Sequence, residues 1–250
     1  MNLHYLRKLL MCNNYKKGKI MKKYSLFGIL ISLLLNFVLI GSAYSAVLWY
    51  NGDYRGYLGG GLANEINTSI AQSNVYEDFQ VINDDGWLVN TIWSNDLMSF
   101  TGVEQAMWEI RRGVSEGNGG TLIAGGISPA TQIATGRGVG SWTPEYTIEV
   151  TGLSIYLEPD TYWLTVAPIG FGYGYSYVSG TNGLNAIGAP VNNNYALWSY
   201  GDLYFTPLPG GLYAPKNFSM GVEGVIPEPA TFSLFGLGLL GLFFKKKKAV

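Results

Sequence analysis

Hydrophobic and polar positions alternate with a period of two along much of the middle of the chain, which is the pattern of half-buried β-strands. The alternation is most regular over residues 145–151. Ile148 and Val150 are expected to face a core there, whereas Glu145, Thr147 and Glu149 are expected to face water. Similar short runs predict further strands at residues 47–50, 76–82, 87–93, 105–112, 121–124, 130–135, 154–157, 161–166, 195–198, 203–205 and 217–223.

Turn-forming residues separate these runs at intervals of roughly ten residues. Asn83-Asp84-Asp85-Gly86 is the strongest hairpin signal, because an Asp-Gly pair accommodates positive φ, and it is expected to join strands 76–82 and 87–93. Glu158-Pro159-Asp160 is expected to form another turn, with proline at its first central position. Residues 62–71 are expected to be a short helix or irregular.

Helix-forming residues are scarce in this region, so the predicted fold class is all-β, an antiparallel β-sandwich. A jelly-roll topology is the preferred version, because eight or more strands with long loops fit it. An immunoglobulin-like sandwich is the alternative. A signal helix and a short transmembrane helix are expected to flank the sandwich at its N- and C-terminal ends.

The N-terminal region carries the features of a secretory signal peptide. Met21-Lys22-Lys23 precedes residues 26–40, which are uncharged and largely apolar, and the small residues Ala43 and Ser45 precede Ala46. This order predicts cleavage after Ser45 by signal peptidase.

Three segments follow from this prediction. Residues 1–45 are an N-terminal extension plus signal peptide, with Met21 as the expected true start and an unusually long basic n-region as the alternative. Residues 46–226 are the β-sandwich domain, which is long enough to bury a sizeable core. Residues 227–250 are a separate sorting or anchor segment.

This C-terminal segment has three parts. The rigid tripeptide Pro227-Glu228-Pro229 comes first, then residues 230–244 without a charge, and then the basic cluster Lys245, Lys246, Lys247 and Lys248. The uncharged part would rise only about 22 Å as a helix, against a hydrocarbon core of roughly 30 Å. The lysines favour the cytoplasmic face, so the segment is predicted to be a short membrane helix with a basic stop.

The segment resembles the PEP-CTERM sorting signal of Gram-negative bacteria. The resemblance lies in Pro227-Glu228-Pro229-Ala230-Thr231, in Leu234, in the Gly/Leu-rich span and in the basic end; Ile226 stands where valine is usual, and lysine stands where arginine is common. It implies that an exosortase, a membrane-embedded cysteine transpeptidase, removes the tail. The protein would be exported, held transiently in the inner membrane, and then found at the cell surface or outside the cell, often with exopolysaccharide. An ordinary C-terminal membrane anchor is the alternative.

Charge limits the partners of the predicted domain. Residues 46–226 contain five basic and sixteen acidic residues, a formal charge of −11, whereas the whole chain carries −1. A surface of this sign is unsuited to nucleic acid.

Catalytic machinery is also limited. Cys12 and His4 are the only cysteine and histidine of the chain, and both precede the predicted cleavage site. The exported domain is therefore expected to lack Ser-His-Asp triads, Cys-His pairs and histidine-based zinc sites. A hydrolase that uses paired carboxylates needs only Asp and Glu and is the alternative. No pair of acids is singled out by its surroundings, so no catalytic residue is assigned and a non-enzymatic role is predicted.

Two kinds of ligand fit the remaining residues. Asp78, Asp84 and Asp85 could supply the oxygen ligands of a calcium ion, although a plain polar turn is the favoured interpretation. No other cofactor is expected. Aromatic rings in Gly/Asn-rich segments could stack on the apolar faces of sugars, with packing under loops as the alternative. These carbohydrate-contact candidates are Trp142, Tyr173, Tyr175 and Trp198.

Taken together, these features predict a secreted, exosortase-processed surface protein. Its β-domain is expected to be a non-catalytic structural or interaction module associated with exopolysaccharide or a biofilm matrix. A secreted polysaccharide-active hydrolase is the alternative.

Overall fold

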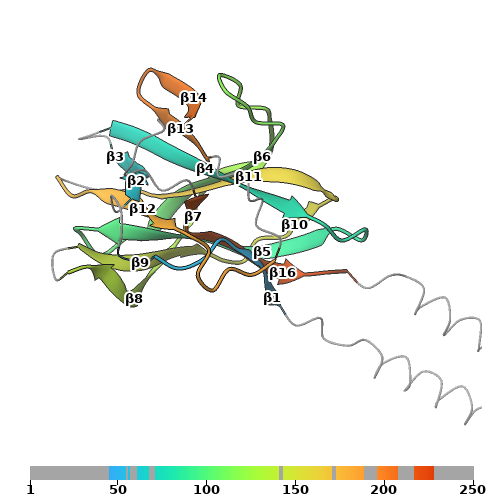
Figure 1. The fold of residues 1–250 in the computed structure, drawn as a ribbon, viewed down its shortest axis with the longest axis horizontal. Helices are drawn as coiled ribbons and strands as arrows, with labels where there is room; N and C mark the ends of the chain where they lie inside the picture. The colour runs from blue at the N-terminus through green and yellow to red at the C-terminus, as the bar shows by residue number, and fades with distance from the viewer. Residues whose placement is uncertain are drawn as a thin grey trace, which may run out of the picture. The chain divides into compact units, whose positions relative to one another are not determined.

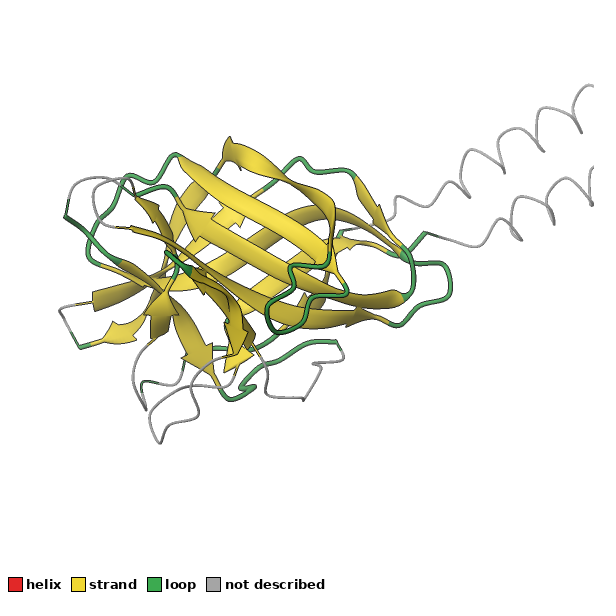
Figure 2. Cartoon of the chain, turned by 90° about the horizontal axis from the view of Figure 1, so that it is seen from above, coloured by secondary structure: helices red, strands yellow, loops and turns green. Residues whose placement is uncertain are grey.

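Two antiparallel β-sheets face one another in a sandwich-like arrangement (Figure 1). The computed structural model describes residues 45–54, 56, 61–67, 71–140, 143–170, 173–188, 196–207 and 217–227. These residues form strands and loops (Figure 2), so the all-β prediction is confirmed. The described ranges contain no helix that is long and apolar enough to cross a membrane. The predicted signal helix and C-terminal membrane helix lie outside them.

Sheet 1 contains nine strands of the described chain. Its main path is β1 (Ala46–Tyr50), β16 (Met220–Val225), β5 (Trp87–Met98), β12 (Ser176–Thr181) and β15 (Asn217–Phe218). Four more strands attach to this path, namely β2 (Gly61–Ala63), β8 (Thr131–Val139), β9 (Thr143–Val150) and β10 (Ile155–Leu157). The long strand β5 is the centre of the sheet, because β16, β12, β9 and β10 all pair with it.

Sheet 2 contains seven strands of the described chain. Their order is β14 (Leu203–Pro207), β13 (Ala196–Tyr200), β4 (Ala71–Val81), β11 (Asp160–Pro168), β6 (Gln105–Arg112) and β7 (Thr121–Pro129), with β3 (Glu65–Asn67) attached to β4. The strand β7 therefore forms one outer edge of sheet 2. The jelly-roll topology stays a prediction.

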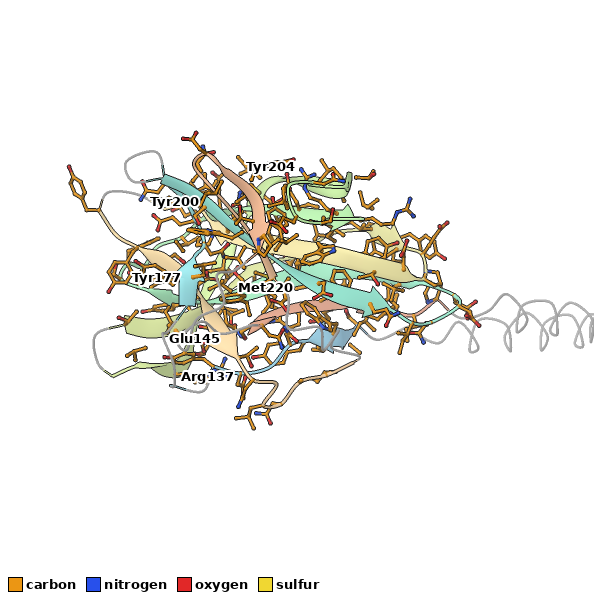
Figure 3. All side chains as sticks on the ribbon, turned by 45° about the horizontal axis from the view of Figure 1, so that its top comes forward. Arg137, Glu145, Tyr177, Tyr200, Tyr204 and Met220 are labelled. Carbon is orange, nitrogen blue, oxygen red and sulfur yellow. The ribbon has the colours of Figure 1, made fainter. Side chains whose placement is uncertain are left out.

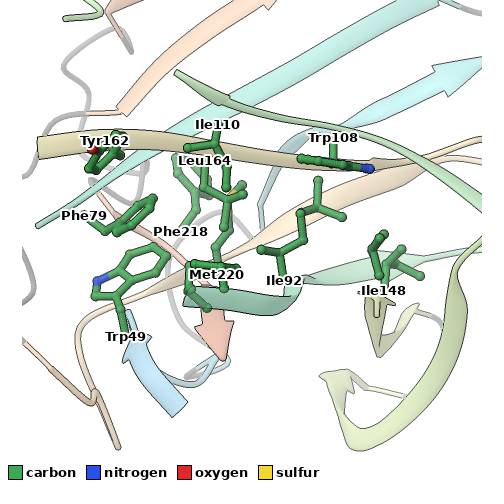
Figure 4. Close-up of a cluster of buried hydrophobic side chains, with 14 of the residues drawn as sticks. Trp49, Phe79, Ile92, Trp108, Ile110, Ile148, Tyr162, Leu164, Phe218 and Met220 are labelled. Carbon is green, nitrogen blue, oxygen red and sulfur yellow. The ribbon is translucent and has the colours of Figure 1, made fainter. Parts of the chain in front are cut away.

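The main core lies between the two sheets and is rich in aromatic residues (Figure 4). Phe79 of β4 lies in the middle of a stack of rings. Its ring centroid is 5.2 Å from that of Trp49, 6.0 Å from that of Trp87 and 5.7 Å from that of Tyr162. These contacts join β4 and β11 of sheet 2 to β1 and β5 of sheet 1. Such rings bury a large apolar area, and each aromatic pair adds about 0.5–1.5 kcal/mol beyond that burial.

A second, smaller core covers the outer face of sheet 2. Alternate residues of β4 point to opposite faces, so Val75 and Phe79 enter the main core whereas Tyr76 enters the smaller one. Trp163 and Phe205 also belong to the smaller core, and Arg111 lies over the Phe205 ring with 5.6 Å between the guanidinium carbon and the ring centroid. Both faces of sheet 2 are thus partly buried.

The predicted hairpin at residues 83–86 is wrong, although the turn itself is present. The backbone N–H of Gly86 donates to the Asn83 carbonyl at 2.9 Å, and Gly86 has φ +67°. The strands on either side do not pair with one another, because β4 belongs to sheet 2 and β5 to sheet 1. An Asp-Gly turn specifies a local reversal of the chain, but the partners of the flanking strands are chosen by long-range burial.

The expectation of a helix or irregular segment at residues 62–71 is also wrong. The short strands β2 and β3 occupy residues 62–63 and 65–67 of this stretch, and residues 68–70 lie outside the described ranges. Between them lies Asn64, whose side chain is fully buried. Pairing with β12 and β4 overrides the weak local preference of this segment.

Candidate functional site

The two ends of the sandwich differ in what they carry. Ala46 pairs with Gly224, so β1 begins beside the point where β16 ends, and we call this the terminal end. Along β5, Leu88 pairs with Val225, whereas Leu97 pairs with Tyr177. Nine residues of strand span about 30 Å. Tyr177 therefore lies at the opposite end of sheet 1, which we call the distal end. Figure 1 shows β12 at one end of the sheet and β1 at the other.

Three exposed tyrosines lead into β12 at the distal end, and we call Tyr173, Tyr175 and Tyr177 the tyrosine strip. Ser176 and Val178 are buried, so the alternating residues Tyr175 and Tyr177 point outward. Their ring centroids are 5.2 Å apart, and Tyr173 is 93% exposed. The strip is an aromatic surface open to solvent.

A depression of about 510 Å³ lies at the same end of sheet 1, between residues 101–104, the start of β8 and Tyr146. Gln132 holds its wall in place. The Gln132 Oε1 accepts from the backbone N–H groups of Gly102 and Val103, at 2.7 and 3.2 Å, and its Nε2 donates to the Phe100 carbonyl at 3.0 Å. The lining thus combines one aromatic ring with hydroxyl, amide and carboxylate groups.

Hydrogen bonds connect the tyrosine strip to Ser99 and Thr143, which precede the lining residues Thr101 and Tyr146 in the chain. The Ser99 N–H donates to the Tyr175 carbonyl at 3.1 Å, and the Tyr175 N–H donates to the Ser99 Oγ at 2.9 Å. The Tyr175 hydroxyl lies 3.4 Å from the Thr143 Oγ1. We call the tyrosine strip and the depression together the distal site.

Chemically, the distal site suits a neutral, hydroxyl-rich ligand. Tyrosine faces can stack on apolar surfaces, and the hydroxyls of Thr101 and Thr131 can both donate and accept. Glu104 is the carboxylate among the lining residues. A glycosidase mechanism needs two carboxyl groups that face each other across the substrate, and the described lining does not place a second one there.

Beside Tyr177 on the outer face of sheet 1 lies an ion-paired cluster centred on Arg137 (Figure 3). The Arg137 Nε is 2.6 Å from the Glu145 Oε2, and the Arg137 Nη1 is 2.9 Å from the Asp53 Oδ1. The Tyr50 hydroxyl donates to the same Asp53 oxygen at 2.7 Å. Burial, followed by the bond to Asp53, raises the pKa of Tyr50 to about 12. The cluster fastens the segment after β1 across sheet 1.

This cluster corrects one expectation for β9. Ile148 and Val150 are buried in the main core as predicted, but Glu145 is also fully buried. It lies on the outer face, as the alternation requires, yet Arg137 covers it from the irregular part of β8, where the register shifts between Ala134 and Gly138. A bulge re-aims side chains in a way that periodicity does not reveal.

A second polar group is enclosed between the sheets. The Asn64 Nδ2 donates to the Asp96 Oδ1 at 3.0 Å and to the Val166 carbonyl at 2.7 Å. The hydroxyls of Ser94 and Ser176 also bond to the Asp96 carboxyl group. Burial raises the pKa of Asp96 from 3.8 to about 7, and the bonds from Ser94, Asn64 and Ser176 only partly offset this.

The neutral form of Asp96 fits the network well. A proton on its Oδ2 can be donated to the Ser94 Oγ, which in turn donates to the Val166 carbonyl at 2.9 Å. Burial acts in the same direction on two other carboxyl groups. It raises the pKa of Glu77 well above its ordinary value and also raises the pKa of Glu65.

We expect the free energy of unfolding to fall as the pH rises from about 4 to about 7. The folded protein binds the Asp96 proton more tightly than the unfolded chain does. Stability is therefore complete below the unfolded pKa and is lost as the pH passes through the folded pKa. A pKa raised from 3.8 to about 7 corresponds to a loss of about 4 kcal/mol. Urea unfolding of the processed protein at a series of pH values measures it.

Asp96→Asn should flatten this pH dependence, because the amide stays neutral and Ser94 can accept from it. Asp85→Asn, at an exposed position of the inter-sheet turn, should leave the slope as in the original protein. Equal slopes in the original protein and in Asp96→Asn would contradict the assignment.

The predicted carbohydrate-contact residues are only partly brought together. Tyr173 and Tyr175 belong to the tyrosine strip. Trp198 lies on β13 of sheet 2, where it is half-buried, stacks on Tyr200 with centroids 5.1 Å apart, and donates from Nε1 to the Ser73 Oγ at 2.7 Å. Trp142 lies outside the described residues.

The calcium hypothesis places its three ligands apart. Asp78 is buried within β4, whereas Asp84 and Asp85 are exposed in the turn that follows it. Among the described ranges, no three Asp, Glu, His or Cys side chains are grouped as metal ligands. The structure therefore does not bring this trio together as a site.

The residues predicted for signal cleavage and for sorting, which we call the processing residues, lie at the terminal end or outside the described ranges. The Ser45 Oγ donates to the Asn90 side chain at 3.0 Å, and Ala46 is the first residue of β1. Pro227 is the last described residue, two positions after β16 ends at Val225. Ala43, Glu228, Pro229 and the four lysines Lys245, Lys246, Lys247 and Lys248 fall outside the described ranges.

Sequence reasoning missed Gln132 and Tyr146, which shape the depression. Tyr146 sits inside a regular strand pattern and looks like an ordinary half-buried aromatic residue. Gln132 acts through backbone groups about thirty positions earlier in the chain, which no local pattern records.

Comparison with known proteins identifies the C-terminal segment. Residues 225–248 match the family model described as the PEP-CTERM protein-sorting motif, which confirms the resemblance seen in the sequence. No curated protein and no solved structure matches the chain.

Proposed function

We propose that this chain, which its PEP-CTERM sorting motif marks as a secreted exosortase substrate, serves outside the cell as a non-catalytic module that binds exopolysaccharide. The motif accounts for export and for a C-terminal, membrane-associated sorting step. Signal peptidase would supply the N-terminal cut after Ser45. The distal site would supply the contact with polysaccharide.

The observation that carries this proposal is the separation of the two ends of sheet 1. The processing residues Ser45, Ala46 and Pro227 belong to the terminal end, whereas the distal site lies about 30 Å away along β5. A ligand at the distal end is therefore kept clear of both cleavage points. Such a module could hold polysaccharide before or after its tail is removed.

The chemistry of the distal site favours neutral sugars over charged ones. Exposed tyrosines supply flat apolar faces, and neighbouring hydroxyl and amide groups can bond to sugar hydroxyls. The described part of the chain contains all sixteen acids of the domain but only three arginines, Arg111, Arg112 and Arg137. A polyanionic glycan would meet repulsion from this surface.

A paired-carboxylate hydrolase receives no comparable support from the described residues. Asp96 and Glu77 have raised pKa values, as a general acid requires, but both are fully buried between the sheets. Substrate could not reach them without opening the sandwich. We therefore put forward the binding function alone.

Replacing Tyr175 and Tyr177 together by alanine should weaken polysaccharide binding about tenfold or more, because two stacking contacts of about 1 kcal/mol each are lost. The measurement is affinity electrophoresis of the processed protein in gels containing the exopolysaccharide of the producing cells. Neutral and uronate-containing polysaccharides should be compared in parallel, with binding expected for the neutral ones.

Tyr156→Ala is the matched control. Tyr156 is an exposed tyrosine on β10, and its partner Leu88 places it at the terminal end. It should leave binding unchanged. An equal loss in this variant, or no retardation of the original protein by any polysaccharide, would refute the distal site as the contact surface.

A further inference from the structure

The strand β7 (Thr121–Pro129) presents an open edge of sheet 2. It pairs with β6, and no other strand of the described chain pairs with it. Every residue of β7 is exposed or half-exposed. Its outward backbone N–H and C=O groups are therefore available for pairing with a further strand.

The usual protection of such an edge is missing here. Exposed edge strands normally carry charged residues, often lysine, or an interior proline. The chain has no charged residue between Glu116 and Arg137, and the proline of β7, Pro129, stands at its last position. Apolar side chains are instead exposed along the strand, with Ile127 61% and Leu122 50% accessible.

The geometry of β7 leaves most of the edge regular. The register with β6 shifts near Ile110 and Arg111, which disturbs only the beginning of β7. From Ala124 to Pro129 the pairing runs without interruption. Gly125 and Gly126 carry no side chain that would keep a neighbouring strand at a distance.

We propose that β7 is a homotypic interface, at which the β7 strands of two copies of this chain pair antiparallel across a two-fold axis. A strand edge is complementary to another strand edge, and a two-fold axis lets the same patch serve both partners. The two copies of sheet 2 then form one continuous sheet. Leu122 and Ile127 of each copy become covered by the other.

The distribution of charge favours the β7 edge over the rest of the surface as the place where a second copy would bind. The described domain is strongly acidic, so two copies repel wherever their charged surfaces meet. Its three described arginines already form ion pairs with acids of their own chain, with Glu109, with Asp160, and with Asp53 and Glu145. They offer little attraction to a neighbour. Residues 117–136 carry no charge, and Glu109 and Arg111 on the neighbouring β6 are paired with one another, so two copies can approach at this edge at low electrostatic cost.

Sedimentation velocity of the processed protein across a wide range of concentration tests the proposal. We expect a reversible monomer–dimer equilibrium whose dimer fraction rises with added salt, because salt screens the repulsion between the acidic copies. Ile127→Lys should weaken the dimer at least tenfold, since an edge lysine blocks strand pairing. Leu122→Lys should have the same effect, and circular dichroism establishes that both variants are folded.

Leu184→Lys is the matched control, at an exposed leucine in a loop of the same molecule. All three variants make the acidic domain less negative by the same amount, so reduced repulsion alone would strengthen association in each. Loss of the dimer in the β7 variants with retention in Leu184→Lys supports the interface. A monomer at every concentration and salt level overturns the proposal. This holds even if β7 pairs with a strand of another protein, because the proposal is that two copies of this chain pair. Dimers that persist in both β7 variants also overturn it.

Discussion

Asn64→Leu should lower the free energy of unfolding by about 3–5 kcal/mol, a large part of the 5–15 kcal/mol typical of a folded domain. Asn64 connects the two sheets at a fully buried position. Its Oδ1 accepts from the Val75 N–H at 3.3 Å, while its Nδ2 donates to Asp96 and to the Val166 carbonyl. Leucine has a similar volume but makes none of these three bonds. Each lost bond costs about 1–1.5 kcal/mol.

Urea unfolding of the processed protein measures this loss, and Asn90→Leu serves as its control. Asn90 is half-buried, and its side chain exchanges hydrogen bonds with Ser45. That change should cost less than about 1 kcal/mol. Similar losses of unfolding free energy in the two variants would mean that the bonds of Asn64 between the sheets stabilise the fold no more than those of the half-buried Asn90.

Strands and turns of this protein could be anticipated because their signals are local. The alternation around Ile148 and Val150 reports a face that is covered by the opposite sheet, and both residues are buried. The turn at Gly86 follows equally from its own residues, since positive φ favours glycine. These local signals do not specify which strands pair with one another. The same turn could have joined two paired strands, but β4 and β5 belong to different sheets.

Buried polar residues were the hardest to anticipate. Asp96, Glu77 and Glu145 look like surface acids in a strongly acidic sequence, yet all three are fully buried. Their partners Asn64, Asn51 and Arg137 come from distant parts of the chain or from an irregular strand. Burial of an acid is decided by whether the fold supplies such partners. A sequence pattern with a period of two contains no information on that.

The distal site could likewise be predicted only in part from the sequence. The tyrosines were recognisable as candidates from their composition alone. Their arrangement was not, because Trp198 follows β13 into sheet 2 while Tyr175 and Tyr177 line sheet 1. The depression depends on Gln132, which bonds to a loop far from it in the sequence. The candidate residue types were thus predictable, but their grouping required the three-dimensional fold.

Glu228→Ala should stop release of the protein from the membrane almost completely. The sorting motif matches at residues 225–248, and Glu228 is the charged residue of its Pro-Glu-Pro tripeptide. The substitution leaves the uncharged residues 230–244 and the four lysines after them intact, so insertion and orientation should be retained. The substitution therefore changes only the tripeptide that the exosortase is expected to recognise. The full-length form should accumulate in the membrane fraction, and the released form should disappear.

The mass of the C-terminus in the released and membrane fractions decides this prediction. The released protein is expected to lack residues 232–250, because a charge-free stretch of about 22 Å is short for a permanent anchor in a hydrocarbon core of roughly 30 Å. Glu223→Ala is the control: it removes an acid five positions earlier, within β16, and should be released normally. Intact Val250 on most of the released protein would show that the tail is not removed. Normal release of Glu228→Ala would show that the processing enzyme does not recognise the acid of the tripeptide.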